Sequence, residues 1–159
     1  MSSEPPVDAD VGLGAPPQRE WRDHPAAVLI AIAAGGALGA LARHGLTTAF
    51  PTASGAVPWA TLCINAGGCA LIGVLMVLIS DVWPGQRLLR PFIGVGFLSG
   101  YTTFSTYVVE IQRAIAVGAP HVALIYMALT VVVAMVAVLT GTILMRALLQ
   151  AARRKAGRS

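Results

Sequence analysis

The fold of this chain is decided by residues 94–107, which read GVGFLSGYTTFSTY. The stretch lies inside an apolar run long enough to cross a bilayer, yet glycines, hydroxyls and aromatic rings replace most aliphatic residues. Glycine weakens a helix, and serine and threonine offer its backbone alternative hydrogen bonds. Within lipid, an interrupted helix is tolerated only where it packs against protein or lines a polar cavity. The stretch therefore predicts a broken membrane helix where an ion meets the protein, although close packing of small residues explains the same pattern.

The composition of the 159 residues is that of an integral membrane protein. Hydrophobic residues make up 56% of the chain and charged residues 11%, whereas soluble domains carry about 25% charged residues. The first apolar run is not led by a basic region, which argues against a cleaved signal peptide. Cys63 and Cys69 lie in one apolar run, so they indicate neither a disulfide framework nor a metal-ligand spacing.

We expect four transmembrane helices in one domain, residues 25–150, between two polar tails. Residues 1–24 are rich in proline, glycine and acids and predict a disordered tail, and residues 151–159 form a basic tail. The predicted spans are 26–49, 57–79, 91–117 and 121–149, each near the roughly 20 residues that a bilayer requires. Gly35 and Gly39 give the first span a small-residue face that allows close approach of another helix.

The basic residues predict the orientation of these spans. Four spans place both termini on one side, and that side holds nine of the eleven basic residues: Arg19, Arg22, Arg87, Arg90, Arg146, Arg153, Arg154, Lys155 and Arg158. Arg43 and Arg113 lie on the other side. The positive-inside rule therefore predicts cytoplasmic termini. The net charge of +4 comes mostly from the tail, so the expected partner of that charge is the lipid headgroup layer and not nucleic acid.

The polar groups inside the spans favour an anion as the solute. Asn65 either bonds to a neighbouring helix or donates N–H to an anion. Phe104 and Tyr107, at i and i+3, can turn the positive edges of their rings toward an anion. Tyr126 and Thr130, at i and i+4, either join helices or begin a lane of hydroxyls. No span core contains a clear acidic residue, which proton-coupled exporters and cation pumps usually need.

Three charged residues stand near span ends. Glu110 and Arg113 share one helix face at i and i+3, and we expect them to form a structural ion pair near the interface. Arg43 ends the first span, where it either anchors the helix by snorkelling or contacts the ion.

Three motifs in this chain resemble the signature of the CrcB/Fluc fluoride channels. They are residues 94–107, the run Gly35-Gly-x-x-Gly-Ala-x-x-Arg43 and the run Pro58-Trp-x-Thr-Leu-x-Ile-Asn65-x-x-Gly68. Their order and spacing match the family, and the resemblance covers residues 27–149. The Thr-Thr-Phe-Ser-Thr and Thr-Leu-x-x-Asn runs are specific when they occur together.

The resemblance implies an antiparallel homodimer of four-helix subunits with two fluoride pores at the subunit interface. It also implies one structural sodium ion, not transported, held where the third helix breaks by the backbone carbonyls of Ser99 and Thr102. The pore residues carried over by position are Asn65 as donor, Phe104 and Tyr107 as the ring pair, Tyr126 and Thr130 as the start of a polar track, and Arg43 as the vestibule arginine. Ser105 and Thr106 are also expected to belong to the fluoride pore.

This chain also departs from the family pattern. Ser99 stands where the family has glycine, and Tyr107 stands where it usually has phenylalanine. Ala134 and Val138 are apolar where the hydroxyl track would continue, which shortens it. The nine-to-two bias of basic residues predicts that the subunit prefers one orientation and pairs with an oppositely oriented paralogue.

The function predicted from these observations is passive export of fluoride across the bacterial plasma membrane by a protein that is not an enzyme. Two alternatives come from other classes. A small four-helix multidrug exporter needs a carboxylate in its first span, and residues 26–42 contain none. A membrane assembly subunit needs no transport site at all.

Overall fold

The computed structural model describes residues 25–53, 55–83, 86 and 88–156, and their regular elements are all helices. These elements are α2 (Pro25–Ala49), α3 (Trp59–Asp81), η1 (Arg90–Phe97), α4 (Leu98–Tyr101), α5 (Ser105–Ala116) and α6 (Pro120–Ala156). Four segments are long and apolar enough to cross a membrane: Pro25–Ala49, Trp59–Asp81, Arg90–Ala116 and Pro120–Ala156. The predicted all-helical class with four spans is confirmed. The predicted disordered tail, residues 1–24, lies outside the described residues.

The last helix is longer than the predicted span. α6 continues beyond Leu149 to Ala156, because residues 150–156 are glutamine, alanine, arginine and lysine, which are strong helix formers. Its 37 residues extend about 55 Å at 1.5 Å per residue, whereas the hydrocarbon core of a bilayer is about 30 Å thick. The basic last turn, Arg153 to Lys155, therefore reaches the headgroup layer or beyond.

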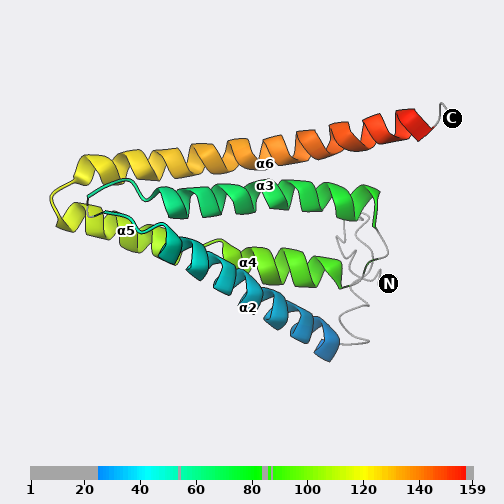
Figure 1. Cartoon of the computed structure of the whole chain (residues 1–159), viewed down its shortest axis with the longest axis horizontal. Helices are drawn as coiled ribbons and strands as arrows, with labels where there is room; N and C mark the ends of the chain where they lie inside the picture. Colours follow the sequence, from blue (N-terminus) through cyan, green and yellow to red (C-terminus); the bar gives the residue numbers. More distant parts are fainter. Residues whose placement is uncertain (1–24, 54, 84–85, 87, 157–159) are drawn as a thin grey trace, which may run out of the picture.

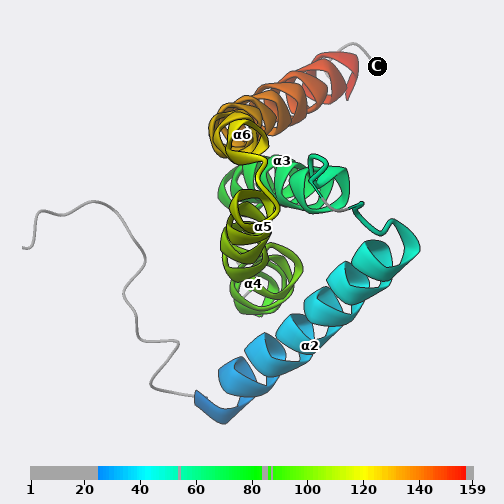
Figure 2. The same ribbon diagram turned by 90° about the vertical axis from the view of Figure 1, so that its left-hand side faces the viewer.

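The helices pack in a simple order. α3 lies between α6 on one side and α4 on the other, and α2 crosses η1 and α4 obliquely (Figures 1 and 2). The start of α2 and the end of α6 lie toward the same end of the bundle, as an even number of spans requires (Figure 1). This order brings residues of α3, α5 and α6 together around the stretch from 94 to 107.

Glycines set the closest helix contact, between α2 and the η1–α4 segment. A Cβ atom at Gly39 would overlap the carbonyl oxygen of Phe97, and one at Gly100 would overlap the carbonyl oxygen of Gly36. The two backbones therefore touch directly. The close-approach face predicted at Gly35 and Gly39 is confirmed, since a Cβ atom at Gly35 would overlap the backbone of η1 in the same way.

Much of the apolar surface faces outward in this single chain. Exposed fractions reach 68% for Ile30 on α2 and 67% for Leu124 on α6. The buried set is small, and its most enclosed side chains are Leu98, Tyr126 and Thr61, each 1% exposed. Outward-facing aliphatic side chains are what lipid or a second transmembrane protein would cover.

Candidate functional site

The segment from 94 to 107 changes course between α4 and α5. α4 ends at Tyr101, Thr102 is extended with φ −77° and ψ 158°, and α5 begins at Ser105. The Thr103 hydroxyl starts the new helix, because it accepts the N–H of Thr106 at 3.2 Å and donates to the Thr106 hydroxyl at 3.1 Å. We call residues Thr102–Phe104 the interruption.

Asn65 of α3 holds the interruption from one side. Its Nδ2 donates to the Thr103 carbonyl oxygen at 3.0 Å, and its Oδ1 accepts the Thr103 N–H at 2.9 Å. These two bonds satisfy both backbone groups of Thr103, which a continuous helix would otherwise satisfy. A carboxamide carries two N–H donors, so one donor of Asn65 remains for a ligand.

Arg43 of α2 holds the segment before the interruption. Its Nε donates to the Gly100 carbonyl oxygen at 3.1 Å. The Leu98 carbonyl oxygen is also satisfied, because it accepts both the N–H of Thr102 at 2.9 Å and the Thr102 hydroxyl at 2.8 Å.

Three carbonyl groups around the interruption stay open. Among the described residues, the carbonyl oxygens of Ser99, Tyr101 and Thr102 accept no hydrogen bond. An unpaired backbone carbonyl away from water costs free energy comparable to a lost hydrogen bond. Hard cations prefer oxygen ligands, so these carbonyls have the donor chemistry that a sodium ion needs. Within the same described residues, no group of three His, Cys, Asp or Glu side chains offers an alternative metal site.

A cavity of about 450 Å³ lies beside the interruption, between α3, α5 and α6. We call it the ring cavity, because Phe104 and Tyr107 line it together with Asn65, Thr130 and Ala134. The ring centroids of Phe104 and Tyr107 are 5.7 Å apart with planes tilted by 39°, and the Phe104 side chain is 76% exposed. Two rings in this arrangement can present a positive edge to the cavity.

The ring cavity contains an unsatisfied hydroxyl. Thr130 Oγ1 is buried and has no hydrogen-bond partner among the described residues. A buried hydroxyl without a partner is costly, and it can donate to a ligand in the cavity. Ala134, one turn further along α6, lines the same cavity without a polar group.

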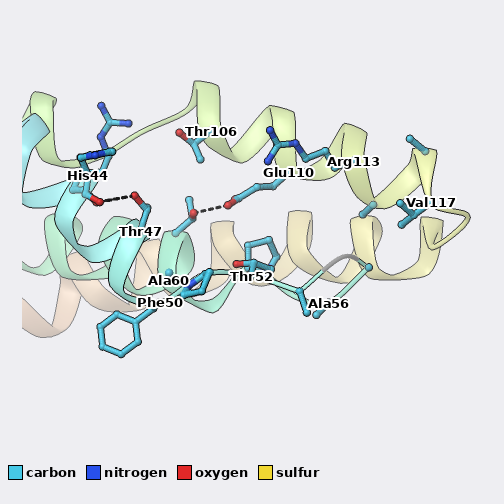
Figure 3. A pocket seen from close by; sticks show the side chains of 18 residues that line it. His44, Thr47, Phe50, Thr52, Ala56, Ala60, Thr106, Glu110, Arg113 and Val117 are labelled. Atoms are coloured by element: carbon cyan, nitrogen blue, oxygen red, sulfur yellow. Dashed lines mark hydrogen bonds between the residues drawn. The ribbon is translucent and has the colours of Figure 1, made fainter.

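A larger cavity of about 600 Å³, which we call the outer pocket, lies at the ends of α2 and α5. Figure 3 shows Thr106, Glu110 and Arg113 of α5 along the pocket and His44 and Thr47 of α2 at one end of it. Arg43 also lines this pocket. The outer pocket therefore combines two fixed positive charges with one carboxylate.

Glu110 joins three helices at the inner wall of the outer pocket. Its Oε1 accepts the Thr61 hydroxyl of α3 at 2.7 Å, and its Oε2 accepts the Tyr126 hydroxyl of α6 at 2.8 Å. The predicted ion pair with Arg113 is wrong, since no ion pair joins the two in the described part of the chain. Both carboxylate oxygens already face the buried hydroxyls of Thr61 and Tyr126, so the side chain points into the bundle.

The structure divides the predicted site residues between these features. Asn65, Phe104, Tyr107 and Thr130 line the ring cavity, and Arg43 and Thr106 line the outer pocket. Tyr126 lies between them, because its ring centroid is 5.2 Å from that of Tyr107 while its hydroxyl bonds to Glu110. Ser105 is exposed with its hydroxyl 3.3 Å from that of Thr103, and Ser99 is exposed in α4. Thr102 lines the ring cavity.

Glu110 and Thr61 were missed as site residues by sequence reasoning. The Thr61 hydroxyl and the Glu110 carboxylate are 49 positions apart, and Glu110 and Tyr126 are 16 apart. The available signal was that Glu110 is an acid flanked by apolar residues, which requires buried partners.

Comparison with known proteins gives consistent matches. The family described as CrcB-like protein, Camphor Resistance (CrcB), matches residues 30–142. The chain is 52% identical over 128 residues to the fluoride-specific ion channel FluC 2 of Nocardia farcinica, covering 80% of this chain and 91% of that protein. It is 48% identical over 121 residues to FluC 2 of Streptomyces avermitilis, covering 76% and 77%. It is 44% identical over 128 residues to FluC 1 of Streptomyces coelicolor, covering 80% and 82%.

Proposed function

The chain belongs to the CrcB family, and from that premise we propose that it is a fluoride-specific ion channel of the bacterial plasma membrane. Its multi-pass architecture provides the membrane-spanning body, and the relatives named above are ion channels, which are not enzymes. The observation that carries the proposal is the ring cavity, where two aromatic rings, an amide donor and an unpartnered hydroxyl converge.

The physical purpose of such a channel is to reverse ion trapping. Hydrogen fluoride is neutral, so it enters a cell through lipid and dissociates in the less acidic cytoplasm. The fluoride anion cannot return through hydrocarbon, because an ion pays a large desolvation cost there. An inside-negative potential drives the anion out once a pore exists. No coupling to protons or nucleotide is needed.

The donors along the proposed path suit a small anion. Arg43 and Arg113 attract anions into the outer pocket, and Thr106 borders it on the side of α5. In the ring cavity, the second N–H of Asn65, the Thr130 hydroxyl and the ring edges replace the hydration shell without a full positive charge. A pore must bind an ion well enough to dehydrate it and weakly enough to release it, and neutral donors meet both conditions.

We also propose that two chains form an antiparallel dimer with the ring cavities at their interface. Phe104 is 76% exposed in the single chain, and an ion path along this ring needs a second protein surface to exclude lipid. The partner is either a second copy or a paralogue of opposite orientation. The bias of basic residues supports the paralogue, and Streptomyces avermitilis has both a FluC 2 and a FluC 3 that are similar to this chain.

The sidedness of the two termini distinguishes these partners. We expect tags at both termini to be accessible only from the cytoplasm when the chain is expressed alone, because most of its basic residues lie on that side. Labelling of tagged cells before and after permeabilisation measures this. Equal populations in both orientations would exclude a fixed orientation and favour the homodimer.

A structural sodium ion is a further part of the proposal. The open carbonyl oxygens of Ser99 and Thr102 would supply two ligands from each chain, and a dimer would bring four oxygens together on its axis. The ion would neutralise carbonyl dipoles that otherwise face one another without partners. Replacement of glycine by Ser99 leaves this backbone carbonyl in place.

Fluoride efflux from liposomes, followed with a fluoride electrode, tests the proposed function. We expect the purified protein to release fluoride and to release little chloride under the same gradient. A multidrug exporter would release neither anion, and it conflicts with the family to which the chain belongs. Absence of flux under all ion gradients would favour the assembly subunit.

The variant Phe104→Ile should reduce the fluoride efflux rate by about tenfold or more in this assay. Isoleucine is apolar and retains bulk but has no ring edge to meet the anion. A ring contact is worth about 0.5–1.5 kcal/mol, and the upper end of this range corresponds to about a tenfold change. Phe92→Ile is the matched control, since Phe92 lines neither cavity. Unchanged efflux from Phe104→Ile would remove this ring from the path.

A further inference from the structure

The contact between Arg43 and Gly100 joins the end of α2 to the turn that precedes the interruption. Arg43 is half-buried, and its Nε donates to the Gly100 carbonyl oxygen at 3.1 Å, across 57 positions of sequence. An arginine that only anchored the span in the interface would direct its donors to water or lipid headgroups. The side chain instead points back into the bundle, toward a backbone group.

The reach of Arg43 depends on glycine packing. A Cβ atom at Gly100 would overlap the Gly36 carbonyl oxygen and come within 3.1 Å of the Ala40 backbone nitrogen. Because Gly100 has no side chain, α2 lies directly on α4, and one turn further along α2 the Arg43 side chain meets the Gly100 carbonyl. The close packing of α2 on α4 therefore determines where the guanidinium lies.

Two side chains from different helices enclose the interruption. Arg43 fixes the carbonyl of Gly100, and Asn65 fixes both backbone groups of Thr103. Tyr101 and Thr102 lie between these two fixed points, and their carbonyl oxygens accept no hydrogen bond among the described residues. In lipid such a segment keeps its course only if the flanking groups hold it.

The guanidinium of Arg43 has donors left over. Arginine carries five N–H donors in a planar fork, and the Gly100 carbonyl takes only the one on Nε. The side chain also lines the outer pocket. The Nε of Arg43 thus bonds to the backbone, while the terminal nitrogens of the guanidinium can donate to a ligand in the outer pocket.

We propose that Arg43 is a positioning residue for the interruption. It holds the backbone of residues 100–104 in the conformation in which Thr103 bonds to Asn65 and Phe104 lines the ring cavity. This inference rests on the proposed function, because it treats the ring cavity as the ion path. It assigns Arg43 a role beyond attracting anions. Loss of the Gly100 contact frees the backbone at one end and leaves Asn65 to hold it alone.

A matched control for charge is present in the same pocket. Arg113 also lines the outer pocket and is exposed, and its side chain makes no hydrogen bond within the described residues. The variant Arg113→Gln removes one positive charge from the pocket without touching the interruption. Arg43→Gln removes one charge and also the Gly100 contact, and Arg43→Lys keeps the charge but loses the planar fork.

The test compares these three variants with the unaltered chain in liposomes over a range of fluoride concentrations. If Arg43 positions the backbone, Arg43→Gln lowers the maximal flux at saturating fluoride by tenfold or more, and Arg43→Lys restores only part of it. Arg113→Gln raises the fluoride concentration for half-maximal flux, and its maximal flux falls by much less than that of Arg43→Gln. Equal maximal flux for Arg43→Gln and Arg113→Gln would overturn the proposal and leave Arg43 as a pocket charge.

Hydrogen exchange of the detergent-solubilised protein provides a readout that does not depend on transport. The amides of Thr102, Thr103 and Thr106 are hydrogen-bonded around the interruption, and we expect them to exchange at least tenfold faster in Arg43→Gln and Arg43→Lys than in Arg113→Gln. Equal exchange in all three would overturn the proposal. If the unaltered chain conducts no fluoride, the proposed function fails, while the exchange comparison still decides whether Arg43 holds this backbone.

Discussion

The variant Asn65→Ala should reduce fluoride flux by at least about tenfold, and it should do so mainly by releasing the backbone of Thr103. Asn65 satisfies both the N–H and the carbonyl of Thr103, at 2.9 and 3.0 Å. Alanine leaves both groups without a partner inside the membrane, and each unsatisfied group costs about 1–3 kcal/mol. The backbone then moves to find other partners, and Phe104, the next residue, moves with it.

A second variant and the exchange of the Thr103 amide separate this backbone role from donation to an anion. Asn65→Asp keeps an acceptor for the Thr103 N–H but has no donor for the Thr103 carbonyl or for an anion, so we expect its flux to fall at least as far as that of Asn65→Ala, while its Thr103 amide exchanges more slowly than in Asn65→Ala. Cys69→Ala is the control, because Cys69 lies one turn further along α3 and lines the same cavity, and its thiol has no hydrogen bond to any residue that the structure describes. The measurements are liposome efflux and exchange of the Thr103 amide. Normal exchange with reduced efflux would instead assign Asn65 to the anion alone.

The sequence predicted those features that depend on local composition. Each span is predominantly apolar over a length that can cross a bilayer, and the glycines of the first span mark a helix face by their spacing alone. The hydroxyls and glycines of residues 94–107 likewise mark a segment that departs from a regular helix. Such signals require no knowledge of which helix lies beside which.

The contacts that build the site depend on helix neighbours, and the sequence does not reveal these. Asn65 and Thr103 are 38 positions apart, and Arg43 and Gly100 are 57 apart. Glu110 illustrates the resulting error, since local spacing favoured Arg113 as its partner. α3 and α6 both pack near α5 and present the hydroxyls of Thr61 and Tyr126, and these buried donors take the carboxylate. Tertiary packing, and not local spacing, thus determined whether Glu110 bonds to Arg113 or to the hydroxyls of Thr61 and Tyr126.

The variant Gly39→Val should prevent α2 from packing on the η1–α4 segment and should strongly destabilise the protein. A Cβ atom at Gly39 would overlap the Phe97 carbonyl oxygen and come within 2.8 Å of the Tyr101 backbone nitrogen. These neighbours are backbone atoms, which cannot turn aside as a flexible side chain can. Overpacking usually costs about 1–3 kcal/mol, and we expect the upper end of this range or more, because the helices must separate along their whole contact.

The comparison with Gly45→Ala makes this prediction specific. Gly45 lies on the same helix, but a Cβ atom there would meet no atom of the described residues within 4 Å, and alanine favours a helix over glycine by up to about 1 kcal/mol. We therefore expect Gly45→Ala to unfold in detergent at the same temperature as the unaltered chain or a higher one, and Gly39→Val to unfold well below it. Equal unfolding temperatures for the two variants would contradict the direct backbone contact. Separation of the helices would also break the Arg43–Gly100 hydrogen bond, so any Gly39→Val protein that folds should share the fast amide exchange of Arg43→Gln around the interruption.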